Sequence, residues 1–290
     1  MLCCASCGIA EVDDIKLKTC PACDLVRYCS EKCQREHQPK HERACKERAA
    51  ELRDEILFKQ PESTHLGDCP ICFLPLPIDT KKSFYECCSK VICNGCEYAN
   101  IIRELEERLE HKCPFCRHPV PTNEEEAALN FLKRVMVNDP VAMCHMGAIR
   151  FKQGVYDDAI KHWTKAAGLG IAEAHYQLSV KYGKGEGVES DEKKELHHLE
   201  EAAISGHPNA RHNLALIEGR NGRIERAVKH WIIAANLGHD VSIKKLKECY
   251  VNGEVSKEDF AAALRAHHAA VDATKSPQRE KAEAFFRNEV

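Results

Sequence analysis

Sixteen of the eighteen cysteines lie within the first 116 residues, and most of them form closely spaced pairs. The pairs are Cys4 and Cys7, Cys20 and Cys23, Cys29 and Cys33, Cys69 and Cys72, Cys93 and Cys96, and Cys113 and Cys116. A gap of two residues lets two thiolates on one tight turn face the same tetrahedral metal ion, with Zn–S distances of about 2.3 Å. Five of the six pairs have this gap, Cys29 and Cys33 are separated by three residues, and six close pairs in succession predict structural zinc sites.

Paired cysteines form disulfides mainly in secreted proteins, and the N-terminal segment has neither the basic nor the apolar stretch of a signal peptide. We therefore expect metal-bound cysteines in a reducing compartment, the cytoplasm and/or the nucleus. No apolar run approaches the ~18 residues that a membrane span needs, so no membrane partner is expected.

The formal net charge of the chain is −3 with every cysteine counted as neutral. Zinc-bound cysteines are thiolates, so four Zn²⁺ held by fifteen cysteines and one histidine would make the net charge about −10. A field of this sign does not attract nucleic acid, and a nucleic-acid partner is not expected.

Eight candidate ligands lie between residues 4 and 45, enough for two four-coordinate sites. They are Cys4, Cys7, Cys20, Cys23, Cys29, Cys33, His41 and Cys45. His41 and Cys45 are four residues apart, which places both on one face of a helix, and Ser30 is placed to cap a helical turn. We expect ligands one, two, five and six to share one zinc, and the other four to share the second.

The order Tyr-Cys-Ser-x2-Cys-Gln followed by His-x3-Cys resembles the MYND zinc finger over nearly its full length. The resemblance implies a protein-interaction module that often takes proline-containing peptides. MYND domains commonly carry Trp three residues before the histidine, and this sequence has Gln38 there. Two alternatives stay open: the finger is only a folding unit, and Cys3 replaces Cys4 as a ligand.

A second framework of eight cysteines spans residues 69 to 116. Its members are Cys69, Cys72, Cys87, Cys88, Cys93, Cys96, Cys113 and Cys116. Between Cys96 and Cys113 we expect a helix with one apolar side, formed by Ile101, Ile102, Leu105 and Leu109. The order of loop, knuckle, helix and knuckle resembles a RING domain in its all-cysteine variant.

Cross-bracing, as the RING resemblance implies, assigns four cysteines to each zinc. One site is Cys69, Cys72, Cys93 and Cys96, and the other is Cys87, Cys88, Cys113 and Cys116. Two adjacent ligands need a bent backbone. If Cys88 were the third ligand, Lys90 would stand where a RING has histidine. Lysine is a poor zinc ligand at neutral pH, so both adjacent cysteines are the preferred ligands.

RING ubiquitin ligases recruit a ubiquitin-conjugating enzyme through three features, and this sequence has a matching residue for each. Ile71 lies between the first two ligands, Pro114 lies in the last knuckle, and Arg117 follows the last ligand. The resemblance implies catalysis by positioning of the ubiquitin thioester, because the domain has no nucleophile. In the alternative interpretation, Ile71 fills a small core, Pro114 stiffens the knuckle, and the module is inert.

Beyond residue 122 the chain repeats itself with a period of about 35 residues. Ala166-Ala167 recurs as Ala202-Ala203, Ala234-Ala235 and Ala269-Ala270. The pattern resembles Sel-one-like repeats, relatives of tetratricopeptide repeats, which present a concave surface to protein partners. The glycine-rich segment 182–191 lacks the ending of a phosphate-binding loop, so we expect an inter-helix loop there. Trp163, Trp231, Cys144 and Cys249 are expected in the helix-packing core.

The sequence therefore predicts small zinc-stabilised α+β modules followed by an all-α helical-repeat solenoid. The expected parts are a MYND-type finger (1–48), a helical linker (49–65), a RING-type finger (66–120), a connecting helix (121–138), Sel-one-like repeats (139–275) and a C-terminal capping helix (276–290). Thr122 and Glu125 form a capping box, so the connecting helix should begin near Asn123.

The functional expectation is a zinc-binding protein-interaction scaffold with four Zn²⁺ ions and, through the RING, ubiquitin ligase activity. Proteins or peptides would bind the MYND finger and the concave face of the repeats, and a ubiquitin-conjugating enzyme would bind the RING. The alternative is a non-enzymatic adaptor whose zinc fingers are structural. Catalytic zinc is excluded, since four protein ligands fill each site and leave no open position.

Overall fold

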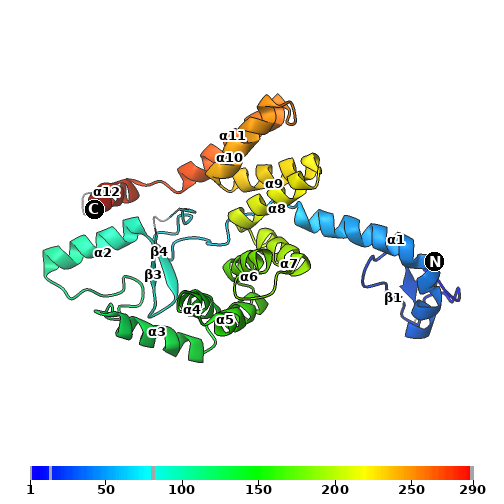
Figure 1. Ribbon diagram of the computed structural model, residues 1–290, viewed down its shortest axis with the longest axis horizontal. Coiled ribbons are helices and arrows are strands. Elements are labelled where there is room, and N and C mark those ends of the chain that lie inside the picture. Colours follow the sequence, from blue (N-terminus) through cyan, green and yellow to red (C-terminus); the bar gives the residue numbers. More distant parts are fainter. Residues whose placement is uncertain (1, 13–14, 80–81, 288–290) are drawn as a thin grey trace. The chain divides into compact units, whose positions relative to one another are not determined.

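The computed structural model describes residues 2–12, 15–79 and 82–287 (Figure 1). The chain divides into two compact units, Met1–Lys59 and Gln60–Val290. Among the described residues, no helix has both the length and the apolar character needed to cross a membrane. The predicted fold class is confirmed: small cysteine-rich modules with short strands precede a region of helical hairpins.

The first unit consists of a short hairpin and one long helix. Strands β1 (Lys18–Thr19) and β2 (Arg27–Tyr28) pair antiparallel, and α1 covers Glu31–Leu57. The Oγ of Ser30 accepts a hydrogen bond from the Cys33 amide at 3.3 Å, so α1 begins at the expected cap. The last helix of the finger and the predicted linker helix are thus one continuous helix, and it ends eight residues before the expected end of the linker.

The second zinc module begins with an antiparallel pair that leads directly into a helix. Strand β3 (Lys82–Tyr85) pairs with β4 (Lys90–Cys93), and α2 (Asn94–Glu107) follows without a loop. The side of α2 expected to be apolar is largely open to solvent, with Leu105 67% exposed.

The buried face of α2 is polar, which the apolar pattern did not predict. Asn100 donates to the Lys112 carbonyl at 3.2 Å, and the Glu104 carboxylate accepts from the Lys112 amide at 3.1 Å. Asn100 also donates to Glu104 at 2.8 Å. The backbone of the last knuckle is buried against α2, and these two side chains satisfy its hydrogen-bonding groups.

The connecting helix α3 (Glu124–Met136) begins one residue after its expected start at Asn123. The Asn123 side chain accepts from the Glu126 amide at 2.9 Å, and the Glu126 carboxylate accepts from the Thr122 amide at 2.9 Å. The predicted box of Thr122 and Glu125 is therefore wrong by one position, because Asn123 is the stronger N-cap of the two neighbours. Phe131 of α3 stacks on Phe84 of β3 at 5.6 Å, which joins the zinc module to the helices.

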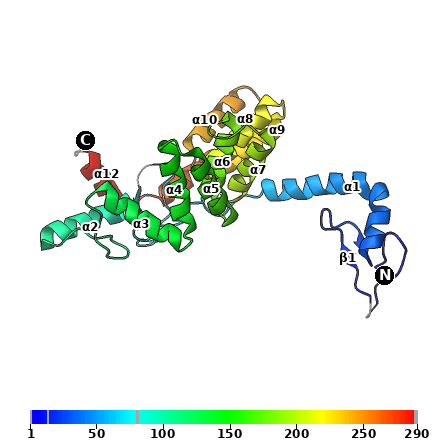
Figure 2. The same cartoon turned by 60° about the horizontal axis from the view of Figure 1, so that its bottom comes forward.

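Four helical hairpins follow, each packed against the next (Figure 2). Their helices are α4 (Pro140–Lys152) and α5 (Tyr156–Gly168), α6 (Ala172–Lys184) and α7 (Glu192–Ile204), α8 (Pro208–Arg220) and α9 (Ile224–Asn236), and α10 (Asp240–Val251) and α11 (Lys257–Ala273). The glycine-rich segment is the loop between α6 and α7, with Gly185 in the left-handed conformation that ends α6.

Small residues on the first helix of a hairpin make room for a large residue on the second. Trp163 is 1% exposed, and its indole N–H donates to the Cys144 carbonyl at 3.0 Å. A Cβ on Gly147 would lie 2.6 Å from the same indole nitrogen. Trp231, Cys144 and Cys249 are buried as well, so these four residues lie in the helix-packing core as predicted.

The C-terminal helix α12 (Pro277–Arg287), drawn in red in Figure 1, packs against α2 of the second zinc module. Residues 276–290 were expected to cap the repeat stack, and the structure corrects this. Hydrogen bonds from α12 side chains to residues 72–95 hold the helix on the zinc module. Residues 288–290 of the expected helix lie outside the described part of the chain.

The segment that leads into the second zinc module lies on the repeats. The His65 amide donates to the Gly206 carbonyl at 3.0 Å, and Asn236 donates to the Gln60 side chain at 3.1 Å. Gly206 has φ +79°, and a Cβ there would lie 2.6 Å from the Ser63 carbonyl oxygen. Part of the repeat surface, around Gly206 and Asn236, is therefore covered by residues 60–65 of the same chain.

The packing of Trp163 gives a stability prediction. We expect Gly147→Ala to lower the free energy of unfolding by about 1–3 kcal/mol, because the new methyl group overlaps the indole. Urea unfolding followed by tryptophan fluorescence measures this, since both tryptophans lie in the repeats. Gly168→Ala is the control: no atom lies within 4 Å of its Cβ position, and it should be neutral or slightly stabilising. Equal stabilities for the two variants would contradict the packing account.

Candidate metal centres

Four clusters of four side chains bring their sulfur and nitrogen atoms together. The clusters are Cys4, Cys7, Cys29 and Cys33; Cys20, Cys23, His41 and Cys45; Cys69, Cys72, Cys93 and Cys96; and Cys87, Cys88, Cys113 and Cys116. Within each cluster the candidate ligand atoms lie within 4.8 Å of one another. These are the four sets that the spacing and the two family resemblances predicted.

The distances in the first unit are those of a tetrahedral metal site. With Zn–S bonds of about 2.3 Å, the edge of a regular tetrahedron is about 3.8 Å. The Sγ atoms of Cys7 and Cys29 are 3.6 Å apart, and those of Cys20 and Cys45 are 3.8 Å apart. A disulfide would bring two sulfurs to about 2.05 Å, so these cysteines are not cross-linked.

The second unit repeats this geometry. The Sγ separations are 3.8 Å for Cys69 and Cys96, 3.7 Å for Cys72 and Cys93, 3.8 Å for Cys88 and Cys113, and 3.4 Å for Cys87 and Cys116. Along the chain, the first and third pairs of cysteines (69/72 and 93/96) share one cluster, and the second and fourth pairs (87/88 and 113/116) share the other. The module is therefore cross-braced.

One backbone turn recurs at four of the cysteine pairs. After the second cysteine comes a residue with positive φ: Gly8 (75°), Asp24 (54°), Phe73 (57°) and Arg117 (63°). The amide of that residue donates to the carbonyl of the first cysteine of the pair at 2.9–3.0 Å. The turn directs both thiolates to the same side, toward one metal ion.

Glycine adopts the left-handed conformation without strain, whereas other residues pay about 1–2 kcal/mol. Phe73 and Arg117 keep their side chains at such positions, and both side chains are exposed, Phe73 by 74%. Phe73 was not among the residues predicted from the sequence. Its signal was the place directly after a Cys-x2-Cys pair, where the backbone favours glycine.

Cys87 and Cys88 both reach the same cluster because the chain turns sharply after them. The amides of Cys88 and Ser89 both donate to the Tyr85 carbonyl, and Ser89 has φ +55°. Burial, together with the nearby Cys113 thiolate, raises the pKa of Cys88 to about 12. A bound cation would relieve this effect, because it favours the thiolate. Lys90 is exposed on β4 and belongs to none of the four clusters.

These donor sets fit Zn²⁺. Cysteine thiolates with at most one histidine are the usual ligands of structural zinc, and four protein ligands fill its tetrahedral shell. The clusters supply four such sets, so the chain has four sites suited to structural Zn²⁺. Cys3 lies outside all four clusters, and Cys4 is the member of the first one.

A fifth group, His65, Glu173 and His207, has the composition of a metal site and a different chemistry. The His207 Nδ1 accepts from the Ala210 amide at 3.2 Å, so its single proton is on Nε2. That Nε2–H donates to Glu173 at 3.0 Å. A metal ion bound at Nε2 would move the proton of the neutral ring to Nδ1. Nδ1 could then no longer accept the hydrogen bond from the Ala210 amide that caps the helix. The group therefore acts as a hydrogen-bonded cap with His65 stacked on it at 4.1 Å.

The three predicted recruitment residues lie around one shallow hollow. Ile71, Pro114 and Arg117 line a depression of about 350 Å³, together with residues of α2 and Gln278 of α12. The Arg117 guanidinium donates to the side-chain oxygen of Asn100 on α2 at 3.2 Å, and both residues line the hollow. Ile71 is 37% exposed.

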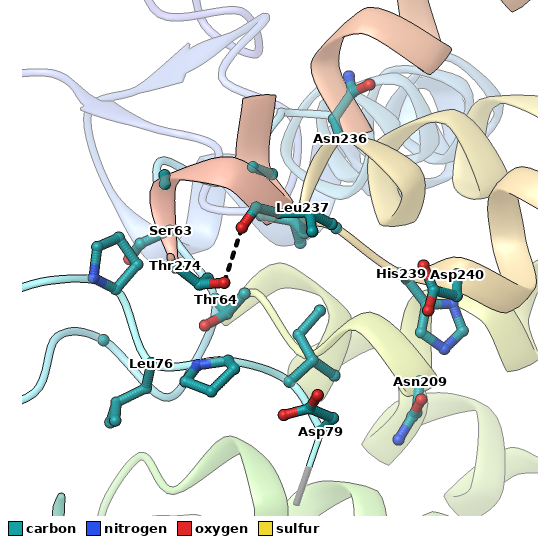
Figure 3. Close-up of a pocket in the computed structure, with 18 of the residues that line it drawn as sticks. Ser63, Thr64, Leu76, Asp79, Asn209, Asn236, Leu237, His239, Asp240 and Thr274 are labelled. Carbon is teal, nitrogen blue, oxygen red and sulfur yellow. Dashed lines mark hydrogen bonds between the residues drawn. The ribbon is translucent and has the colours of Figure 1, made fainter. Parts of the chain in front are cut away.

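A larger pocket of about 600 Å³ lies where the zinc module meets the repeats (Figure 3). Ser63, Thr64 and Leu76 line one wall, and Leu237 and Asp240 line another. The end of α11 closes it, where the Thr274 hydroxyl donates to the Val271 carbonyl at 2.7 Å. The pocket has the size of a few amino-acid side chains.

Comparisons with known proteins bear on both parts of the chain. Residues 4–45 match the family model of the MYND finger. A Sel1 repeat protein from Oxalobacter formigenes superposes with a TM-score of 0.44 and 20% identity, over 62% of this chain and 74% of that one. The protective antigen c5321 of uropathogenic Escherichia coli, which displays an SLR fold, gives a TM-score of 0.41 and 21% identity, over 58% of this chain and 37% of that one. No curated protein matches the sequence.

The helical repeats are identified from the four stacked hairpins of the structure. MYND fingers and stacked helical hairpins are protein-interaction modules. The chain is therefore a zinc-binding protein-interaction scaffold, and proteins are the class of partner that fits it.

The adjacent ligands give a prediction about metal content. We expect the wild-type protein to hold about four zinc ions, and Cys87→Ser and Cys88→Ser to lose about one each, because serine is a poor zinc ligand. Elemental analysis by mass spectrometry measures the zinc-to-protein ratio. Cys3→Ser is the control and should retain all four. An unchanged ratio in Cys87→Ser would show that another group completes the cluster.

Proposed function

We propose that the second zinc module is a RING-type ubiquitin ligase domain whose substrates are selected by the MYND finger and the helical repeats. The observation that supports this most is the meeting of Ile71, Pro114 and Arg117 around one hollow. In RING ligases, residues at these three places bind the conjugating enzyme and position its ubiquitin. The spacing of the ligands alone does not require that the three side chains share a surface.

The place of Arg117 favours a role for its side chain. Its backbone lies at φ +63°, where glycine would be less strained, and the residue is exposed. Asn100 holds one nitrogen at 3.2 Å and leaves the other donors for a partner. An arginine fork of this kind suits simultaneous hydrogen bonds to ubiquitin and to the conjugating enzyme.

Ile71 supplies the apolar part of the proposed surface. It stands between Cys69 and Cys72 on the knuckle, so the zinc site fixes its backbone. The side chain is partly exposed and borders the same hollow as Pro114. Burial of this isoleucine under a conjugating enzyme would contribute binding energy through the hydrophobic effect.

The MYND finger would bind its partner without an indole platform. Gln38 is exposed on α1, at the position where the family commonly has Trp. The neighbouring His37 is held in place, stacked on His41 at 5.8 Å and hydrogen bonded to Tyr28 at 3.1 Å. A partner would therefore meet an amide and an imidazole there, which favours polar peptides over proline-rich ones.

For the repeats, we propose the pocket of Figure 3 as the place where a partner segment inserts. Its wall carries both apolar groups, such as Leu237, and hydrogen-bonding groups, such as Asn209. This mixture is typical of sites that take a peptide. The reduced, metal-bound cysteines lead us to propose a cytoplasmic and/or nuclear location.

A non-enzymatic adaptor is the second candidate, and one observation favours it. Gln278 of α12 borders the hollow that would receive the conjugating enzyme, and α12 covers part of α2. In an adaptor, α12 at this position would impair no function. In a ligase, the conjugating enzyme would have to bind the hollow next to α12.

Two substitutions separate recruitment from catalysis. We expect Ile71→Ala to weaken binding of a cognate conjugating enzyme about tenfold, about 1.4 kcal/mol, through lost apolar burial. Arg117→Gly should leave binding within about twofold and slow ubiquitin discharge at least tenfold, because it removes donors that position the thioester. Binding is measured by calorimetry and discharge by single-turnover assay.

Arg117→Gly also relieves the backbone strain at a positive φ, so its control must relieve the same strain at another turn. Asp24→Gly makes that change at the equivalent turn of the first unit and should leave discharge unaltered. Lack of discharge by the zinc-loaded wild-type protein across a broad panel of conjugating enzymes would contradict the ligase proposal and support the adaptor.

A further inference from the structure

The cluster of Cys69, Cys72, Cys93 and Cys96 is the most enclosed of the four. Cys69 is 0% exposed, Cys93 1% and Cys96 6%. Zinc bound to four thiolates carries a net charge of −2, and a buried charge of this kind is costly unless a cation or hydrogen-bond donors compensate it. The cluster that contains His41 also has three buried ligands, but one of them is that neutral histidine. The remaining two clusters have two buried ligands and one, so this is the only one of the four clusters with three buried thiolates.

A buried arginine from the C-terminal helix lies against this cluster. Arg279 is 7% exposed, and its Nη2 lies 3.5 Å from the Sγ of Cys72. The same guanidinium donates to the carbonyls of Leu74 at 3.2 Å and Pro75 at 2.7 Å. It also donates to the carbonyl of Thr274, three residues before α12 begins, at 2.6 Å. Three backbone oxygens therefore fix the guanidinium in contact with a ligand sulfur.

The backbone of the zinc module is shaped to admit this helix. Gly95 lies directly before the ligand Cys96, and a Cβ there would meet the Arg279 Cγ at 2.8 Å and the Arg279 amide nitrogen at 3.1 Å. The Gln278 side chain donates to the Gly95 carbonyl at 2.8 Å. The rings of Tyr98 and Phe285 pack at 5.2 Å along the same contact between α2 and α12.

We propose that Arg279 is an outer-sphere residue of the zinc site formed by Cys69, Cys72, Cys93 and Cys96, so that zinc binding and the docking of α12 stabilise each other. The guanidinium would offset part of the negative charge of the thiolates and donate to Cys72. It touches no reacting group, so its role is one of positioning and charge. The coupling is reciprocal by linkage: whatever α12 adds to zinc affinity, zinc adds to the docking of α12.

The first test measures zinc retention in the full chain. Loss of an outer-sphere partner typically lowers metal affinity 10- to 100-fold, so Arg279→Met should release one zinc to a chelator at least tenfold faster than wild type. Alkylation of the freed thiols, mapped by mass spectrometry, should mark Cys69, Cys72, Cys93 and Cys96 first. Arg279→Lys keeps the charge without the full fork and should fall between the two.

The matched control lies on the same helix. Arg287 is exposed at the end of α12, and Arg287→Met should release zinc at the wild-type rate. Should Arg279→Met fail to fold, Gly95→Ala carries the test, because it displaces Arg279 without removing its charge. That variant should also release one zinc faster, from the same four cysteines.

The effect of zinc on the docking of α12 is measured separately. Partial chelation of wild type, to the point where this site empties, should raise hydrogen–deuterium exchange in residues 277–287. If Arg279→Met or Gly95→Ala frees α12 by this measure and zinc release stays at the wild-type rate, α12 is only a packing element and the proposal is overturned.

Discussion

Convergence of four ligands on one tetrahedral ion is the constraint on which the N-terminal part of this protein depends. The two zinc modules have few apolar residues to bury, and the buried side chains of their cores are largely the ligands themselves. Sulfur atoms that lie 3.4–3.8 Å apart without a cation would repel as thiolates. With zinc, the same convergence becomes the main source of folding energy, about 10–16 kcal/mol per structural site. The left-handed turns, the bent chain at Ser89 and the polar face of α2 all follow from it.

The second zinc module belongs to the same compact unit as the helical repeats, and three contacts hold it in place. Phe84 stacks on Phe131, the segment before the module bonds to Gly206, and α12 returns to lie on α2. These contacts join chain segments far apart in sequence. A conjugating enzyme bound at the proposed hollow would thus be held in a fixed relation to the repeats. In the proposed ligase, a substrate held by the repeats would meet the ubiquitin thioester from a restricted set of directions.

The sequence was informative where spacing alone determines geometry. Cysteine spacing, together with the resemblances to MYND and RING fingers, predicted which side chains cluster. Ser30 predicted the start of α1, and the small residues predicted hairpins with Trp163 between their helices. Contacts between distant parts of the chain could not be predicted from the sequence. The sequence of α12 is that of an ordinary amphipathic helix, and only the three-dimensional fold brings Arg279 to Cys72. Leu105 was placed on an apolar side of α2 by its spacing, but the buried side of the helix carries Asn100 and Glu104. The backbone of the last knuckle needs these two side chains as hydrogen-bond partners, and apolar spacing cannot reveal that need.

Four closed zinc sites hold the N-terminal modules together. Anomalous diffraction at the zinc absorption edge, from crystals of the full chain, would locate these ions. We expect four peaks, one at the centre of each cluster, each about 2.3 Å from its sulfur ligands. Fewer than four peaks, or a sulfur–sulfur bond of about 2.05 Å between Cys87 and Cys116, would contradict this expectation.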